Sequence, residues 1–354
     1  MILGYKPDFD RAKRQWSLFW KGENRRPLVN IVVSKQGVKP IDAPRYLSGR
    51  DGNFRPVIDQ WLAYFETHEF IGEAMPYIPV EWGPDTFSSF LGADLKFFPE
   101  GNPYTSWCQP FVTDWDEAEL RFRRDGYWWQ MTLEYFGELK RQFDGKALIN
   151  PPTILANLDA LAAVRGPENI LVDILECPEK VKTALEKVNR VHDEVLGEYA
   201  KVLEFDKYGS MGVEATYCDG IHSRPQCDIS CMLGVDMFGE FVLPSLEHEF
   251  GVQDAGVYHL DGSGAIRHLE SLCSIGRLDV ICWVPSAGND QEKDWFHLFE
   301  KIDGLGKGQV FWGLDYETVK LMWEEFKSRK LFFKGTMGSR AEAEDLIAKL
   351  ENLG

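Results

Sequence analysis

The chain alternates between short apolar runs and longer segments in which apolar residues recur every three to four positions. The runs are rich in β-branched and aromatic residues and predict buried strands at Leu28–Val33, Tyr77–Trp82, Ala147–Asn150, Met211–Cys218, Gly256–Leu260, Val280–Val284, Gln309–Leu314 and Leu331–Phe333. The periodic segments predict helices, among them Arg55–Thr67, Glu179–Leu203, Met237–Glu249, Ala265–Leu272, Tyr316–Phe326 and Ala341–Leu353. Because the strand runs are continuously apolar, we expect a parallel sheet that is covered on both faces.

Eight strands separated by helices predict an α/β fold of the (β/α)8 type, a TIM barrel, in one domain over residues 1–354. Residues 1–27 are expected to form a helical cap. Residues from about 87 to 144 carry many aromatic side chains and are expected to form an insertion near the barrel mouth. The alternative is an open doubly wound sheet, which usually has a glycine-rich phosphate loop. The sequence contains no G-x-G-x-x-G and no G-x-x-x-x-G-K-[ST] motif.

Composition narrows the class of protein. Of the 354 residues, 44% are hydrophobic, which is enough for a large core, and the net charge of −17 argues against a nucleic-acid partner. No apolar run reaches the ~18 residues that would span a membrane, and the N-terminal segment has no secretory pattern. The seven cysteines are scattered without a C-x-x-C pair, so we expect a reduced, cytoplasmic protein.

Function in such a barrel lies at the carboxyl ends of the strands. Polar, aromatic or thiol residues at those positions are Glu81, Trp82, Asn150, Glu214, Tyr217, Cys218, Asp219, His259, Asp261, Cys282, Trp283, Asp315 and Thr336. The most distinctive are His259 and Asp261, which share one side of an ending strand because they are two residues apart. They could bind a metal, or act as a general acid and base. In the alternative, Asp261 caps the next helix and His259 only bonds a neighbour.

Two further carboxylates are candidates for catalysis. Asp228 follows the fourth predicted strand and either projects over the mouth or caps the helix that follows it. Glu214 lies within that strand, so it either points inward as a site group or pairs with a cation.

Five residues are candidates for contact with the substrate. They are Tyr217, Trp283, Asn150, Arg340 and Trp82. Arg340 follows the last strand, where barrel enzymes often bind anions, but a solvated charge at a helix start is the alternative. Trp283 could equally well be a packing residue.

Several segments resemble the uroporphyrinogen decarboxylase superfamily, in this order: Leu158–Val172, Glu176–Val181, Asp236–Pro244 and Tyr258–Gly262. The resemblance runs from about Pro27 to the C-terminus and implies a single (β/α)8 barrel. The superfamily includes the true decarboxylases and the corrinoid-linked methyltransferases. The N-terminal segment Asn24–Leu28 lacks the arginine-rich motif with which the true decarboxylases bind porphyrin carboxylates, so the methyltransferase branch is favoured.

The resemblance also implies a metal centre that this sequence alters. The methyltransferases bind zinc through a His-x-Cys motif and a later cysteine. Here His259 matches the histidine, whereas Asp261 and Thr336 occupy the two cysteine positions. The loss of two thiolates weakens a zinc site and favours oxygen-ligated metals. The metal candidates are therefore His259, Asp261 and, from its barrel position, Cys282.

Three hypotheses follow. The first is a methyltransferase-like enzyme that acts on a small molecule, with a corrinoid protein as its partner and the corrinoid as a partner-bound cofactor. The second is a metal-independent decarboxylase or lyase in which Asp228 donates a proton and Arg340 holds a carboxylate. The third is a non-catalytic ligand-binding barrel. Superfamily members are often dimers, which makes a homodimer one expected assembly.

Overall fold

A seven-stranded sheet organises the molecule. The computed structural model describes residues 3–98, 105–285 and 294–353, and it orders the strands β2-β1-β13-β12-β11-β10-β9. All neighbours pair in parallel except β2, which lies antiparallel to β1 at one edge. The bounds are β1 (Leu28–Ser34), β2 (His68–Gly72), β9 (His222–Ser223), β10 (Ala255–Asp261), β11 (Val280–Val284), β12 (Gly308–Trp312) and β13 (Leu331–Thr336).

Three smaller pairs complete the strands. They are the parallel pair β3 (Tyr77–Pro79) with β6 (Leu148–Asn150), and the antiparallel pairs β4 (Asp94–Phe98) with β5 (Thr105–Gln109) and β7 (Ser210–Met211) with β8 (Tyr217–Cys218). Among the described residues, no hydrogen-bonded ladder joins these pairs to the larger sheet. The structure therefore confirms an α/β fold with a central parallel sheet.

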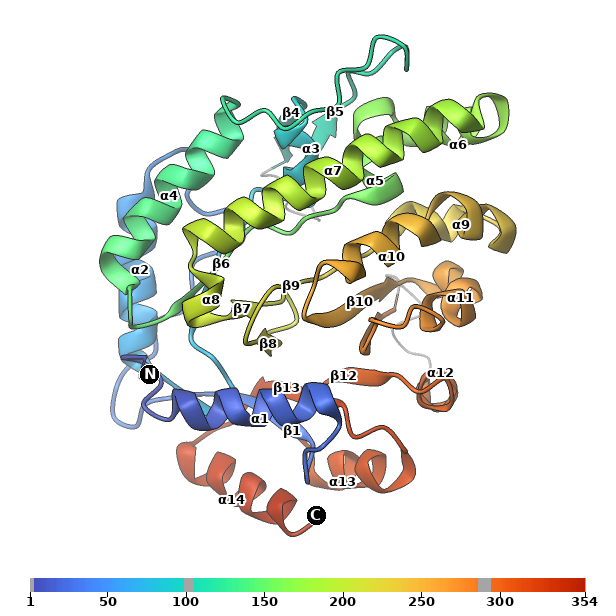
Figure 1. The fold of residues 1–354 in the computed structure, drawn as a ribbon. Helices are drawn as coiled ribbons and strands as arrows, with labels where there is room; N and C mark the ends of the chain where they lie inside the picture. The colour runs from blue at the N-terminus through green and yellow to red at the C-terminus, as the bar shows by residue number, and fades with distance from the viewer. Residues whose placement is uncertain (1–2, 99–104, 286–293, 354) are drawn as a thin grey trace.

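The helices lie around the outside of the strands (Figure 1). Among them, α14 packs on β1 and β2, α12 packs on β12, and α4 packs on β6. Their bounds are α1 (Phe9–Lys21), α2 (Phe54–Thr67), α3 (Thr86–Phe90), α4 (Tyr127–Phe143), α5 (Asn157–Arg165), α6 (Pro167–Glu176), α7 (Pro178–Val202), α8 (Phe205–Tyr208), α9 (Val235–Phe241), α10 (Leu243–Gly251), α11 (Leu269–Cys273), α12 (Phe296–Gly304), α13 (Tyr316–Glu325) and α14 (Arg340–Glu351), with 3₁₀ turns η1 (Asp228–Met232) and η2 (Ser263–His268).

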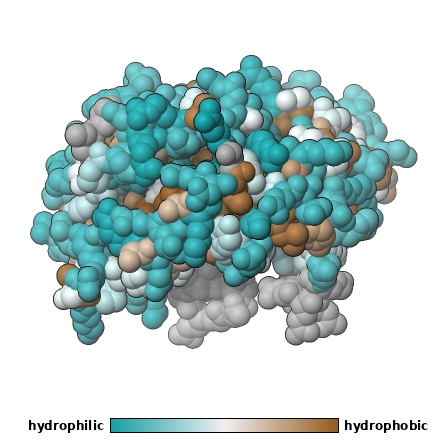
Figure 2. Space-filling view, turned by 90° about the horizontal axis from the view of Figure 1, so that it is seen from below, coloured by the Kyte–Doolittle hydropathy of each residue, from teal (hydrophilic) through white to brown (hydrophobic). Residues whose placement is uncertain are grey.

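One face of the molecule is mostly polar. Seen from below Figure 1, the side on which α13 and α14 lie is largely hydrophilic, and hydrophobic side chains show only in separate patches (Figure 2). Among the described residues, no helix is both long and apolar enough to cross a membrane.

One apolar cluster gathers side chains from α1 and from several strands. It joins the buried face of α1 to residues near the start of the strands, namely Phe9, Ala12, Trp16, Phe19, Leu28, Leu148, Met211, Val257, Val280, Val310 and Phe332. Since side chains alternate along a strand, the residues two positions later lie on the same face. For β10, β11 and β13 these are His259, Cys282 and Lys334, so the apolar layer leads directly to a polar one.

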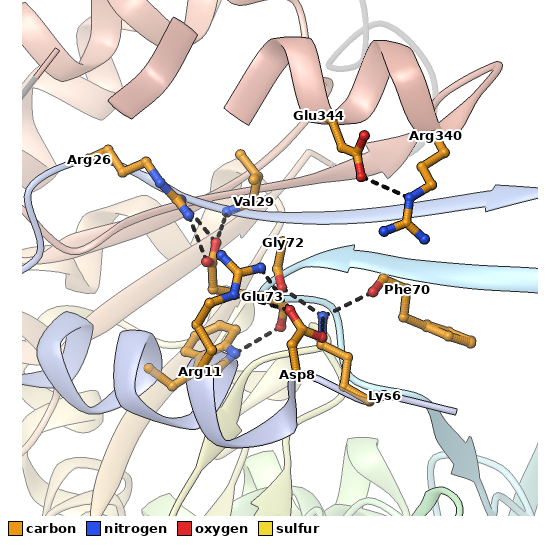
Figure 3. Close-up of polar contacts among 11 residues, drawn as sticks. Lys6, Asp8, Arg11, Arg26, Val29, Phe70, Gly72, Glu73, Arg340 and Glu344 are labelled. Atoms are coloured by element: carbon orange, nitrogen blue, oxygen red, sulfur yellow. Dashed lines mark hydrogen bonds and ion pairs between the residues drawn. The ribbon is translucent and has the colours of Figure 1, made fainter. Parts of the chain in front are cut away.

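Polar contacts fix the N-terminal segment to this end of the sheet. The indole of Trp16 donates to the carbonyl of Glu73 at 3.0 Å, and the ammonium of Lys6 donates to the carbonyls of Phe70 and Gly72 at 2.9 and 2.8 Å. Arg26 binds the fully buried Glu73 carboxylate through both of its terminal nitrogens (Figure 3). A helix was predicted within residues 1–27, and α1 is that helix.

Several sequence-based boundaries were wrong. The predicted strand Met211–Cys218 is instead β7, a turn and β8, and the parallel neighbour of β10 is the short strand β9. The predicted helix Met237–Glu249 is divided into α9 and α10, with Pro244 in the first turn of α10, where a missing N–H is tolerated. Strand β2 was not predicted. The region from 87 to 144 contains the paired strands β4 and β5 and the outer helix α4.

Candidate functional site

The carboxyl ends of the parallel strands carry a compact polar cluster. His259 on β10 lies beside Cys282 on β11 in register, Lys334 lies on β13, and Arg224 directly follows β9. The fifth member, Glu214, comes from the turn between β7 and β8. The strand alternation described above places the first three side chains on the face that is apolar nearer the strand starts.

Arg224, Glu214 and His259 form the centre of the cluster. The Arg224 Nη1 atom lies 3.0 Å from Glu214 Oε1 and 3.1 Å from His259 Nδ1, and these last two atoms are 3.1 Å apart. All three side chains are largely buried, with exposed fractions of 13%, 4% and 14%. Burial alone would raise the pKa of Glu214, but the charges of Arg224, His259 and Lys334 outweigh it and lower the pKa. Glu214 is therefore an ionised carboxylate.

This arrangement allows His259 to adopt either of its two neutral tautomers. If Nδ1 accepts a hydrogen bond from Arg224, then Nε2 carries the hydrogen and can donate it. If Nδ1 donates to Glu214, then Nε2 is a free acceptor, which can act as a base. Glu214 and Arg224 thus hold the ring in place while permitting either role.

The same atoms do not suit a divalent metal. Ligand atoms of Glu214, His259 and Cys282 lie within 4.8 Å of one another, which is the spacing of a metal site. However, the Arg224 guanidinium bonds both Glu214 and His259, so a fixed positive charge lies at the position that a cation would need. Burial also raises the pKa of the Cys282 thiol well above its ordinary value, which opposes thiolate ligation. Asp261, predicted as a ligand, is not part of this group.

Glu81 adds a group that titrates near neutrality. It follows β3 and accepts hydrogen bonds from the hydroxyl of Thr153 at 2.8 Å and from its backbone N–H at 3.2 Å. Burial raises the pKa of Glu81 to about 7, against the opposing effects of Thr153 and Arg224. A carboxyl group with this pKa can both give and take a proton near neutral pH.

Lys334 adds a second positive charge to the cluster. Its ammonium lies 4.5 Å from the centre of the Trp312 ring, and among the described residues it makes no ion pair with a carboxylate. Burial lowers the pKa of Lys334, partly offset by the charge of Glu214. Such a group can bind an anionic part of a ligand.

A cavity of about 420 Å³ lies between β5, α5 and η1, and none of the five cluster residues is part of its lining. Its walls include Trp107, Leu155 and Ala162, and its polar groups include Asp85, Asp159 and Asp228. Asp228 lies close enough to His259 and Arg224 for their charges to affect its pKa. Through Asp228, the cavity is electrostatically linked to the cluster.

Two of these carboxyls interact closely. Asp159 accepts hydrogen bonds from the backbone N–H groups of Asp228, at 2.8 Å, and Ile229, at 3.0 Å, so it caps η1. Burial and the charge of Asp228 raise the pKa of Asp159 to about 8. The pKa of Asp228 is also raised, first by removal from water. Asp228 does not cap η1 itself, because its oxygens accept from the side-chain amide of Gln226.

Most of the predicted substrate contacts lie elsewhere. Trp82 is fully buried and donates to Thr132, and Tyr217 is buried beside α1 and donates to the carbonyl of Tyr208. Trp283 lies on the opposite face of β11 from Cys282 and packs against Trp295 at 4.9 Å. These are contacts of packing residues. Asn150 does lie near the cluster, because it lines a small cavity of about 20 Å³ together with Arg224.

Arg340 lies in a second, outer hollow. This space of about 520 Å³ is bounded by the N-terminal segment, β2 and α14. Arg340 pairs there with Glu344 at 2.8 Å (Figure 3). It also pairs with Glu69 at 3.2 Å, and its side chain is 61% exposed. The expectation that Arg340 contacts the substrate at the strand ends therefore fails, because carboxylates outside the cluster already bind it.

We expect Arg340→Gln to leave activity unchanged, since the side chain has no contact with the cluster. Stability should change by no more than about 0.5 kcal/mol, as is typical of exposed ion pairs. The comparison of kcat/KM and of the urea midpoint with those of the original protein checks this. A clear rise in KM alone would show that Arg340 contacts the substrate.

Comparison with known proteins supports the fold. No known protein family matched the sequence, and no curated protein matched it. Among solved structures, a methyltransferase from Methanosarcina mazei has a similar fold, with a TM-score of 0.58 over 96% of this chain and 98% of that chain at 11% sequence identity. The likeness therefore covers nearly the whole of both chains, and at this identity it concerns the fold.

Proposed function

We propose that this protein is a methyltransferase that acts on a small molecule at the carboxyl ends of the strands. The observation that carries the proposal is the Glu81 carboxyl, with a pKa of about 7, beside the fixed Arg224–Glu214–His259 cluster. The whole-chain likeness to a methyltransferase supports the same class of reaction.

The chemistry of methyl transfer explains why such a group is useful. When a methyl group leaves oxygen, nitrogen or sulfur, that atom gains an electron pair and must be protonated. When a methyl group is accepted, the acceptor must lose a proton. Glu81 would supply or remove this proton, and His259 Nε2 could serve on the other side of the ligand. Positioning of the reacting atoms in the cavity would add to the rate.

The positive charges have separate roles in this scheme. Arg224 holds Glu214 and His259 in fixed positions, whereas Lys334 is free to bind a negatively charged part of the small molecule. The carboxyl of Asp159, whose pKa is raised to about 8, would offer a hydrogen-bond donor at the cavity.

We further propose that the chain is a distant member of the uroporphyrinogen decarboxylase superfamily and that β3, β6 and β7 continue the sheet into a barrel. The shared apolar cluster, which includes residues of β6, β7 and β10, supports this closure. A corrinoid on a partner protein would donate or accept the methyl group. A homodimer remains a prediction.

Methylcobalamin provides the test. We expect the protein to bind it and, with a panel of thiols, phenols and amines, to convert it to the demethylated corrinoid, which has a distinct absorption spectrum. Lys334→Met should raise the KM for anionic acceptors about tenfold with little change in kcat. Failure to bind either methylcobalamin or a corrinoid protein would contradict the methyltransferase proposal.

A lyase is the second candidate, and the raised pKa of Asp228 beside His259 favours it. A protonated Asp228 could protonate the carbanion that remains after a carboxylate is lost as carbon dioxide. Since Arg340 lies elsewhere, Lys334 would have to hold the carboxylate. Release of carbon dioxide from small carboxylates without a corrinoid would support this candidate over methyl transfer.

A further inference from the structure

A second cluster of metal-binding side chains lies between α7 and α10, outside the site described above. His192 and Asp193 are neighbours on α7, and His248 is on α10, which packs against α7. His192 Nδ1 is 3.1 Å from Asp193 Oδ1, and His248 Nε2 is 2.9 and 3.0 Å from the two oxygens of Asp193. One ligand atom of each residue lies within 4.8 Å of the other two.

This spacing is close to that of a zinc centre. Atoms that bind zinc at 2.0–2.1 Å in a tetrahedron lie about 3.3 Å apart, and the two histidine–aspartate distances of 2.9 and 3.1 Å are close to this value. Two imidazoles and one carboxylate form a common set of protein ligands for zinc and similar ions. Asp193 and His248 are 41% and 37% exposed, so an ion can enter, whereas His192 is buried and held in place.

The cluster of His192, Asp193 and His248 differs from the strand-end cluster in the positive charges that lie near its carboxylate. Asp193 makes ion pairs only with the two histidines in the described parts of the chain, and no arginine or lysine competes for its carboxylate. The cluster therefore favours an added cation.

Within the part of the chain that the structure describes, two buried polar atoms nearby make no hydrogen bond. They are Nε2 of His192 and Oδ1 of Asn189. Asn189 lies one helical turn before His192 and Asp193, so the three residues share one face of α7. Oδ1 of Asn189 is a buried acceptor without a donor, which is costly, and we suggest that a water molecule on the ion would donate to it.

We propose that α7 and α10 bind a divalent transition metal such as zinc through His192 Nδ1, one carboxylate oxygen of Asp193 and His248 Nε2. Water would occupy the remaining position. The ion would fasten the two helices together, and this site is independent of the reaction proposed above.

Zinc titration of the metal-free full-length protein against a chromophoric chelator tests the proposal. We expect one equivalent to bind in the original protein, and His248→Gln and Asp193→Asn each to weaken binding at least about tenfold. Both altered side chains are partly exposed, so the variants should fold. Zinc should also raise the melting temperature of the original protein and not that of the variants.

Two controls separate this site from other histidines. His297→Gln removes a 94% exposed histidine that lies 3.9 Å from Glu300, and His259→Gln alters the strand-end cluster. Both should retain the bound zinc. The proposal is overturned if the protein binds no zinc at micromolar concentration, or if His248→Gln binds as well as the original protein. Loss of zinc in His259→Gln alone would also overturn it and would place the ion at the strand ends.

Discussion

Replacing Arg224 with methionine is expected to lower the free energy of unfolding by about 3–5 kcal/mol at neutral pH. Glu214 is 4% exposed and depends on Arg224 for its charge balance, so the variant leaves a buried carboxylate with only the more distant Lys334 and the His259 ring. The variant should also lose most activity, because the His259 ring loses one of the two groups that hold it. Urea unfolding with a spectroscopic probe measures the first effect.

The dependence on pH distinguishes this cause from a simple packing defect. In the original protein the folded-state pKa of Glu214 lies below its ordinary value of 4.5, so this group stabilises the fold above that pH and the contribution is lost as pH falls. Without Arg224, the effect of burial on Glu214 dominates. The pKa of Glu214 is then expected to rise above its ordinary value, so the ionised group destabilises the fold. The difference between the two proteins should therefore be large at about pH 7 and much smaller at about pH 4.

A double variant provides the control. Glu214→Gln together with Arg224→Met removes both charges, so it should be more stable than Arg224→Met alone. If the single and double variants were equally unstable at every pH, the loss would come from the volume of Arg224 and not from its charge.

Strand alternation accounts for much of what the sequence revealed about the site. His259, Cys282 and Lys334 each lie two residues after an apolar residue of the same strand. Because side chains on a strand alternate between its two faces, these three side chains point to the same side as the apolar residues. The same period explains why Trp283 faces away. His259 and Cys282 were predicted from their positions near the carboxyl ends of strands, whereas Lys334 directly follows the predicted strand Leu331–Phe333 and was overlooked.

The residues that the sequence did not reveal lie where no periodic pattern exists. Strands β7, β8 and β9 have two residues each, which is too short for alternation to be recognised. Glu214 was therefore assigned to a strand although it lies in a turn, where Ala215 adopts a φ of +61°. Arg224 was passed over as part of a polar loop. Its role depends on Glu214 and His259, which are 10 and 35 residues away in the chain.

The pKa of Glu81 could not be deduced from the sequence either. Its position after a predicted strand was visible, but the pKa depends on burial and on Thr153, which lies 72 residues further along the chain. The pKa of Asp159 could not be deduced for the same reason. Asp159 caps η1, whose residues follow β9 and are distant from Asp159 in the chain.

Replacing Glu81 with glutamine is expected to reduce the rate of the methyl-transfer step about 100-fold to 10,000-fold, which is the usual contribution of a general acid or base. The amide keeps the size of the side chain and can still accept from Thr153, so the fold should persist. In the original protein the rate should change with pH around the Glu81 pKa of about 7. Single-turnover measurements across this range should show that the variant lacks this titration.

The free energy of unfolding should also depend on the protonation of Glu81, in a direction that the raised pKa determines. The folded-state pKa of Glu81 is raised above its ordinary 4.5, so its contribution is complete below that pH and is lost as pH rises through about 7. The loss is on the order of 3 kcal/mol, and Glu81→Gln should abolish it.

Glu249→Gln is the matched control for this prediction. Burial raises the pKa of Glu249 to about 8, and the group bonds Asn157 away from the strand-end cluster. This variant should alter the dependence of stability on pH while leaving the rate and its titration intact. If Glu81→Gln also kept the full rate and the same titration, the proton would have to come from another group, and His259 would become the first residue to replace.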